Sequence, residues 1–301
     1  MKKWIKRVLW FLVGLVLIFT SVVYFYLPRL VIEIKNPIVF KHRDIPVTYG
    51  EVFPDGKEVT ITTFDNLKLK GFLTYATTQK AKGTVILLHG IRSVKESYIG
   101  LSKDLSVQGY NTFAFDLRAH GESEGRYNTF GAKERKDVSA IVDYLDGKGY
   151  SNVGVWGRSL GGAIALQALG TDDRLKFGVI ESTFSDFNIV VHDYTALFTG
   201  IDSYAFSNFL VKRAGEIGEF NPESVKPVEL CKQIKQPIYM SHGTADHRIA
   251  YKYGKMNYDA LASEQKVFET IPNATHMNVW YIAGEAHFNK IVNFLNETIA
   301  E

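Results

Sequence analysis

The stretch of sequence from Val153 to Leu169 constrains the fold more than any other part of the chain. It reads as an apolar run, then the turn Gly157-Arg158-Ser159-Leu160-Gly161, then a helix rich in alanine, isoleucine and leucine. A buried strand that passes through a tight turn into a buried helix is typical of an α/β domain with a parallel sheet. Because such a turn lifts the serine clear of the sheet, we interpret Ser159 as a candidate nucleophile.

A second segment with the same spacing, Gly121-Glu122-Ser123-Glu124-Gly125, tests this interpretation. It is flanked by polar segments, with neither a strand directly before it nor a helix directly after it. The bare G-x-S-x-G pattern is short enough to arise by chance, so its structural context decides its meaning. We therefore expect Ser123 to lie in a surface loop.

The composition is that of one folded domain with a basic tail. The 301 residues are 46% hydrophobic and 22% charged, enough to bury one substantial core. The single cysteine, Cys231, can form neither an intramolecular disulfide nor a cysteine-cluster zinc site, and we expect it to be a small buried side chain. The formal net charge of +3 is concentrated in Lys2, Lys3, Lys6 and Arg7. The remaining chain is nearly neutral, which argues against a nucleic-acid-binding surface.

The segment Val8–Leu27 is uncharged and long enough to span a membrane as a helix, which Pro28 is expected to end. Aromatic residues that favour the membrane interface lie towards its two ends: Trp4, Trp10, Tyr24 and Tyr26. The alternative is a cleaved secretory signal, but that would have a shorter apolar core and a small-x-small cleavage site. We therefore predict an uncleaved single-pass anchor. The dense basic flank over residues 1–7 favours a cytoplasmic amino terminus and an extracytoplasmic folded domain.

After a proline-containing connector over residues 28–58, the pattern predicts a mainly parallel α/β domain over residues 59–301. Val59–Phe64 and Leu67–Tyr75 alternate in polarity and predict an antiparallel hairpin at a sheet edge. Later apolar runs, typical of buried parallel strands, alternate with helical patterns on both faces of the sheet. Strands are expected over residues 84–88, 111–115, 152–156, 176–180, 237–241 and 266–271, and helices over 95–108, 132–145, 160–169 and 283–299. Functional residues are expected where these strands end.

Residues 184–235 interrupt this alternation, and we interpret them as a mostly helical cap over the strand ends. The segment is rich in aromatic residues: Phe187, Tyr194, Phe198, Tyr204, Phe206, Phe209 and Phe220. These rings either attach the cap to the core or line an apolar substrate pocket.

His276 is the expected base among the eight histidines, because it lies in the loop that follows the last predicted strand. The others fit structural roles: His287 as a surface or packing residue of the final helix, His192 in the cap, His42 in the connector, His242 in packing or hydrogen bonding at a strand end, and His89 in bracing a loop.

Asp246 is the expected acid that orients the base, since it also follows a strand. Asp116 ends another strand, but we expect an internal contact with Arg118 that braces its loop. Asp193 lies more remotely, in the cap. His247 beside Asp246 suggests a metal site, yet no third ligand stands at suitable spacing, and we predict no metal.

A developing oxyanion needs two N–H donors. The backbone of Leu160 supplies one from the turn, and Ile91 is expected to supply the other, because Gly90 in His89-Gly90-Ile91-Arg92 allows close approach.

From residue 59 onwards the chain resembles the α/β-hydrolase superfamily, and it is most similar to the serine-aminopeptidase-like branch. The resemblance rests on the order Ser159, Asp246, His276 and on four strings: Leu88-His89-Gly90, Asp116-Leu117-Arg118-Ala119-His120-Gly121-Glu122-Ser123, Gly157-Arg158-Ser159-Leu160-Gly161-Gly162 and His242-Gly243-Thr244-Ala245-Asp246. One departure is Ala119, where many relatives have glycine. It places the loop geometry in question more than the chemistry.

The resemblance implies acyl transfer to water through an acyl-enzyme, with no cofactor. Carboxylic esters, lipid esters and thioesters are the expected substrates, because an aromatic cap suits an acyl chain and an anchor holds the site near lipid. Two alternatives stay open: a serine peptidase of the aminopeptidase type, and a membrane-anchored binding protein without catalysis. The sequence does not fix the oligomeric state.

Overall fold

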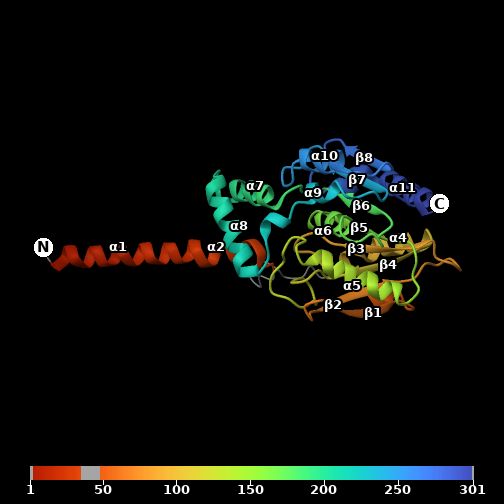
Figure 1. Cartoon of the computed structure of the whole chain (residues 1–301), viewed down its shortest axis with the longest axis horizontal. Coiled ribbons are helices and arrows are strands. Elements are labelled where there is room, and N and C mark those ends of the chain that lie inside the picture. Colours follow the sequence, from red (N-terminus) through yellow and green to blue (C-terminus); the bar gives the residue numbers. More distant parts are fainter. Residues whose placement is uncertain (1–2, 35–47, 300–301) are drawn as a thin grey trace.

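Six parallel strands and an antiparallel hairpin form one eight-stranded sheet in the order β1-β2-β4-β3-β5-β6-β7-β8 (Figure 1). The structure is a computed structural model that describes residues 3–34 and 48–299. The expected hairpin is confirmed, with β1 at the sheet edge. The strands are β1 (Lys57–Thr62), β2 (Lys68–Thr74), β3 (Gly83–Leu88), β4 (Tyr110–Phe115), β5 (Val153–Arg158), β6 (Gly178–Glu181), β7 (Ile238–Gly243) and β8 (Lys266–Ile271).

Helices cover both faces of this sheet, as the alternating pattern predicts. Successive side chains of β3 point to opposite faces, so that Ile86 joins one core and Leu87 the other. The Ile86 face packs against α5 (Glu134–Asp146), α6 (Leu160–Leu169), α9 (Pro227–Cys231) and α10 (Tyr251–Ala260). The Leu87 face packs against α4 (Ile99–Val107) and α11 (Val279–Ile299). Nearly every residue of β3 to β7 is buried, as expected for parallel strands that are covered on both faces.

Several boundaries differ from the expected ones for local reasons. The helix expected over residues 95–108 divides into a 3-10 turn, η2 (Lys95–Tyr98), and α4. The last helix begins four residues earlier than expected and has a kink at Gly284, where φ is 60°. The expected connector contains a short helix, α3 (Tyr49–Val52), which begins with a capping box between Thr48 and Glu51. Residues 35–47 of that connector, with His42, lie outside the described residues, as does Lys2.

The expectation that Pro28 ends the apolar helix is wrong. One continuous helix runs from Lys3 to Ile32 through α1 (Lys3–Ser21), a π-helical turn η1 (Val22–Tyr26) and α2 (Leu27–Ile32). Pro28 stands in the first turn of α2, where a missing N–H donor is tolerated. The helix is long and apolar enough to cross a membrane, and none of the side chains of α1 is buried.

Residues 184–235 contain the cap helices α7 (Phe187–Thr199) and α8 (Tyr204–Gly218), followed by η3 (Pro222–Ser224) and α9. Asp186 caps α7 by accepting from the N–H of Asn188, and Ser203 caps α8 by accepting from the N–H of Phe206. Gly200, with φ of 72°, ends α7. Both helices lie at the end of the domain from which α1 projects (Figure 1).

Candidate active site

Ser159 occupies a strained turn between β5 and α6. Its φ of 57° and ψ of −118° lie in a region that non-glycine residues rarely adopt, at a cost of about 1–3 kcal/mol. Two hydrogen bonds hold the turn: the N–H of Ser159 donates to the carbonyl of Glu181 at 2.8 Å, and Thr183 Oγ1 donates to the carbonyl of Ser159 at 2.9 Å. The side chain therefore stands at the carboxyl end of the sheet, at the first turn of α6.

The two flanking glycines are required by sterics. A Cβ on Gly161 would lie 1.9 Å from the carbonyl oxygen of Leu88, and a Cβ on Gly157 would lie 2.2 Å from that of Gly161. No side chain fits at either distance, which is the physical reason for the expected pattern.

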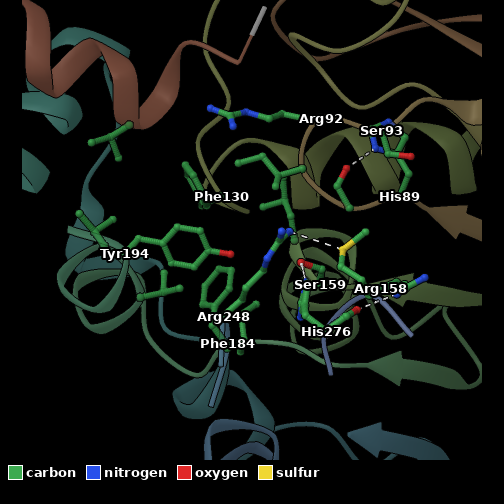
Figure 2. A pocket seen from close by; sticks show the side chains of 18 of the residues that line it. His89, Arg92, Ser93, Phe130, Arg158, Ser159, Phe184, Tyr194, Arg248 and His276 are labelled. Atoms are coloured by element: carbon green, nitrogen blue, oxygen red, sulfur yellow. Dashed lines mark hydrogen bonds between the residues drawn. The ribbon is translucent and has the colours of Figure 1, made fainter. Parts of the chain in front are cut away.

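The structure brings Ser159, His276 and Asp246 together. His276 Nε2 lies 2.9 Å from Ser159 Oγ (Figure 2). On the other side of the ring, His276 Nδ1 lies 2.7 Å from Asp246 Oδ2. His276 comes from the loop between β8 and α11, and Asp246 from the loop after β7. All three side chains are buried against the surrounding loops. This is the geometry in which an imidazole can take the hydroxyl proton while a carboxylate orients the ring.

Asp246 is held in its ionised form. Burial opposes its ionisation, but hydrogen bonds with His242 and His276 outweigh burial and hold the pKa of the carboxyl well below its usual range. The N–H groups of Arg248 and Ile249 both donate to Asp246 Oδ1 at 2.9 Å.

His242 supports this carboxylate, a contact that sequence reasoning missed. Its Nε2 lies 2.9 Å from the carbonyl of Ile249 and 3.4 Å from Asp246 Oδ2. The expected hydrogen-bonding role is confirmed, and the four-residue spacing from Asp246 was the available signal. Arg158 also fixes the site, since its guanidinium donates to the carbonyl of His276 at 2.7 Å.

Ile91 and Leu160, the expected oxyanion donors, line the same cavity as Ser159. The N–H of Leu160 opens α6, where helical N–H groups lack intrahelical partners. His89 braces the loop as expected: its Nδ1 lies 2.8 Å from the carbonyl of Gly90, and its Nε2 accepts from the N–H of Leu117 at 3.0 Å. A Cβ on Gly90 would meet Ser159 Cβ at 3.5 Å, an ordinary contact, so the backbone does not itself require glycine there.

The loop after β4 differs from expectation in its ion pairs. Asp116 pairs with Lys95, whose ammonium lies 3.0 Å from Asp116 Oδ2, and not with Arg118. Arg118 instead binds Asp137 at 2.6 Å and Asp65 at 2.9 Å. The contact across the loop comes from distant elements, so local spacing could not reveal it.

Ser123 is buried and not exposed on the surface. Its hydroxyl donates to the carbonyl of Asp116 at 2.6 Å and accepts from the N–H of Lys70 at 2.9 Å. Ala119 in the same loop adopts φ of 61°, the left-handed conformation that glycine would take without cost. Ala119 therefore holds this turn at a conformational cost that glycine would avoid.

His287 is a buried packing residue, so the surface alternative is wrong. It lies between two carboxylates, with Nε2 3.0 Å from Glu181 Oε1 and Nδ1 2.5 Å from Glu269 Oε2. His192 stacks on Tyr204 at a ring-centroid distance of 3.6 Å. Cys231 is buried as expected.

A cavity of about 830 Å³ opens above Ser159. Figure 2 shows Tyr194, Phe130 and Phe184 across the cavity from Ser159 and His276. The cap aromatics divide between the two expected roles: Tyr194 and Phe198 line the cavity, while Phe187 and Phe220 pack into the core. The rest of the lining includes Leu30, Val31, Val190, Val191, Arg92 and Arg248.

Comparisons with known proteins agree with this architecture. The model of the serine aminopeptidase S33 family matches residues 79–227. The uncharacterized protein YfhR of Salmonella typhi is 28% identical over 285 residues, which span 89% of this chain and 88% of YfhR. WAV2 of Arabidopsis thaliana, an α/β-hydrolase domain-containing protein, is 29% identical over 203 residues, 64% of this chain and 62% of its own length.

A solved structure, that of an esterase from Pyrococcus furiosus, superposes with a TM-score of 0.68 and 26% sequence identity. The match covers 83% of this chain and 94% of the esterase. The sheet order, the turn at Ser159 and these relatives agree: the chain belongs to the α/β-hydrolase superfamily.

Proposed function

We propose that this protein is a membrane-anchored serine hydrolase that cleaves carboxylic esters through an acyl-enzyme. The observation that carries the proposal is the continuous contact from Asp246 through His276 to Ser159 at the floor of a mostly apolar cavity.

In the proposed reaction, Ser159 Oγ attacks the ester carbonyl while His276 Nε2 takes the hydroxyl proton. The N–H groups of Leu160 and Ile91 stabilise the oxyanion. His276 then returns the proton to the leaving alcohol as the carbon–oxygen bond breaks. Water, deprotonated by His276, then attacks the acyl-enzyme. As the bond between the acyl carbon and Ser159 Oγ breaks, His276 returns the proton to Oγ and the acid leaves. Asp246 stays ionised throughout and holds the imidazole in orientation.

An ester fits the cavity better than a peptide does. Phe130, Phe184 and Val190 provide an apolar wall for an acyl chain. A site for a peptide amino terminus would use a carboxylate, whereas the residues that line the cavity in the described part of the chain include three arginines and no aspartate or glutamate. The esterase from Pyrococcus furiosus supports the same preference.

The membrane anchor rests on the helix from Lys3 to Ile32. A cleaved signal is disfavoured because the last turn of this helix belongs to the fold: Ile32 is buried in the core and Leu30 lines the cavity. The basic residues before the span favour an extracytoplasmic catalytic domain.

Labelling with a fluorophosphonate probe tests the proposed nucleophile. Wild-type protein is expected to be labelled at Ser159, and Ser159→Ala to lose labelling and about a millionfold in ester turnover, because the three residues act as a unit. Ser123→Ala is the matched control and is expected to keep most of its labelling, with thermal unfolding measured to confirm that it is folded. Labelling that depends on Ser123 would contradict the assignment, and an unlabelled but folded wild type would favour the binding protein without catalysis.

A further inference from the structure

The apolar amino-terminal helix is part of the wall of the candidate active site. Leu30 and Val31, in its last turn, line the same cavity as Ser159 and His276. The helix is firmly docked: Ile32 is buried, its carbonyl accepts from the N–H of Asn128 at 2.9 Å, and Arg213 of α8 stacks over the Tyr24 ring at 4.0 Å. The direction in which the helix leaves the domain therefore fixes how the cavity faces a membrane.

The length of the helix places the cavity mouth at the level of the lipid head groups. Residues 3–32 extend about 45 Å, whereas the hydrocarbon core is about 30 Å thick. The uncharged segment Val8–Leu27 fills the hydrocarbon core. The turn that follows carries the exposed Arg29, which suits lipid phosphates, and then Leu30, which is 43% exposed and lines the cavity.

The turn between α7 and α8 offers a second apolar surface at this end of the domain (Figure 1). We call it the cap tip and define it as Leu197, Phe198, Ile201 and Tyr204, which are 54%, 72%, 45% and 58% exposed. Such side chains gathered on one turn are unusual on a surface that faces only water. Phe198 also lines the cavity, so the cap tip is continuous with the mouth of the cavity.

The cap tip is tied to the rest of the cap by side-chain and backbone contacts. His192 stacks on Tyr204 and its Nε2 lies 3.0 Å from Asp202 Oδ1, while the N–H of Gly200 donates to the carbonyl of Ala196 at 3.0 Å. Because α8 also packs against α2, the cap tip and the anchor are connected through one helix.

We propose that the cap tip inserts into the interface of the bilayer that the anchor crosses, and that the cavity takes its substrate, an ester-bearing lipid, directly from that leaflet. The inference rests on the proposed ester hydrolysis for its substrate and on the proposed anchor for its geometry. Leu30 on one side and Phe198 on the other would flank the path of the acyl chain from the leaflet to Ser159.

Lipid contact can be tested without any turnover. Full-length Leu197→Cys, labelled with a nitrobenzoxadiazole fluorophore and reconstituted in phosphatidylcholine vesicles, is expected to be quenched by lipids with a doxyl group near the head group. The buried Cys231 is protected from the label. Val107→Cys is the matched control, since Val107 is 62% exposed in α4, far from the anchor (Figure 1). A cap tip that is covered by a second copy of the chain, or that stays in water, would give equally weak quenching at both positions. That result would overturn the proposal.

Substrate delivery is tested with two esters that share one leaving group. In the vesicles, Leu197→Asp/Ile201→Asp is expected to lose at least tenfold in hydrolysis of membrane-held methylumbelliferyl oleate but less than twofold with water-soluble methylumbelliferyl butyrate. Val107→Asp is expected to lose neither. Equal losses with both esters would contradict delivery from the leaflet. A wild type that hydrolyses neither ester would instead contradict the proposed function, and the quenching result would still decide whether the cap tip meets the bilayer.

Discussion

At the scale of single residues, the glycines around Ser159 serve two different purposes. Gly161 is needed by the backbone, because its Cβ would overlap the carbonyl oxygen of Leu88. Gly90 has room for a Cβ at ordinary contact distance, but that atom would stand 4.0 Å from Ser159 Oγ, beside the space that a substrate carbonyl would enter. Substitutions at the two positions should therefore distinguish an effect on folding from an effect on catalysis.

Alanine at each position is expected to give opposite results. Gly161→Ala should fail to fold or lose more than about 3 kcal/mol of unfolding free energy, because backbone atoms cannot move aside cheaply. Gly90→Ala should keep or slightly raise the unfolding temperature, since alanine restricts the unfolded chain. Its kcat/KM for esters should nevertheless fall about tenfold, or about 1.4 kcal/mol. Thermal unfolding and ester kinetics measure both, and unchanged kinetics in Gly90→Ala would show that the space beside Oγ is not used.

The proximity of Ser159, Asp246 and His276 could be predicted from sequence because each follows a strand, and parallel strands end at one edge of the sheet. The partner of Asp116 could not. Lys95 reaches it from the turn after β3, and only the folded loops show that this lysine lies closer than Arg118.

At the scale of elements, α11 is joined to β6 and β8 by a buried ionic cluster of His287, Glu181 and Glu269. Burial lowers the pKa of His287, but the two carboxylates outweigh burial and raise it above its ordinary value. Burial likewise opposes ionisation of Glu181, yet its contacts with His287 keep its pKa below the ordinary value. The folded cluster thus favours the protonated imidazole and the ionised carboxylates over their neutral forms.

The stabilisation from His287 is expected to depend on pH in a defined direction. Because its folded pKa is raised, its contribution is complete below the unfolded pKa of about 6.5 and is lost as pH rises through the folded value. His287→Gln should lower the unfolding free energy by about 3–5 kcal/mol at pH 6, since it breaks a buried pair, and by less at pH 9. Chemical denaturation across this range measures the difference. The exposed His247→Gln serves as control, and a loss at His287 that is the same at both pH values would contradict a charged imidazole.

Strands and most helices could be predicted from periodicity, whereas two features of the helices depended on tertiary structure. The apolar helix continues through Pro28 because a π-helical turn precedes it and because α8 packs against its last turn. The final helix begins early because a kink at Gly284 joins two helical segments. Neither cause is visible in a hydrophobic pattern.

At the scale of the whole molecule, alternation of strands and helices predicts a parallel sheet, but it does not give the order of the strands. That order puts β3 and β5 side by side at the centre, which brings the loop with Ile91 against the turn with Ser159. The docking of the amino-terminal helix on the cap could not be predicted from the sequence either. An apolar helix has the same hydrophobic pattern whether or not its end packs on a domain.

This docking predicts that the domain begins inside the apolar helix and not after the connector. Deletion of residues 1–27 should give a soluble protein that hydrolyses methylumbelliferyl butyrate, because neither α1 nor η1 has a buried side chain. Deletion of residues 1–34 also removes Ile32 and Ile34, which are buried. With about 2 kcal/mol or more for each such side chain, and about 2–4 °C for each kcal/mol, the unfolding temperature should be lower by about 10 °C. Thermal unfolding of the two proteins in one buffer tests this, and equal temperatures would mean that α2 contributes nothing to the fold. Hydrolysis of vesicle-held oleate should fall in both truncations, since neither keeps the proposed span that would hold the cavity at the leaflet.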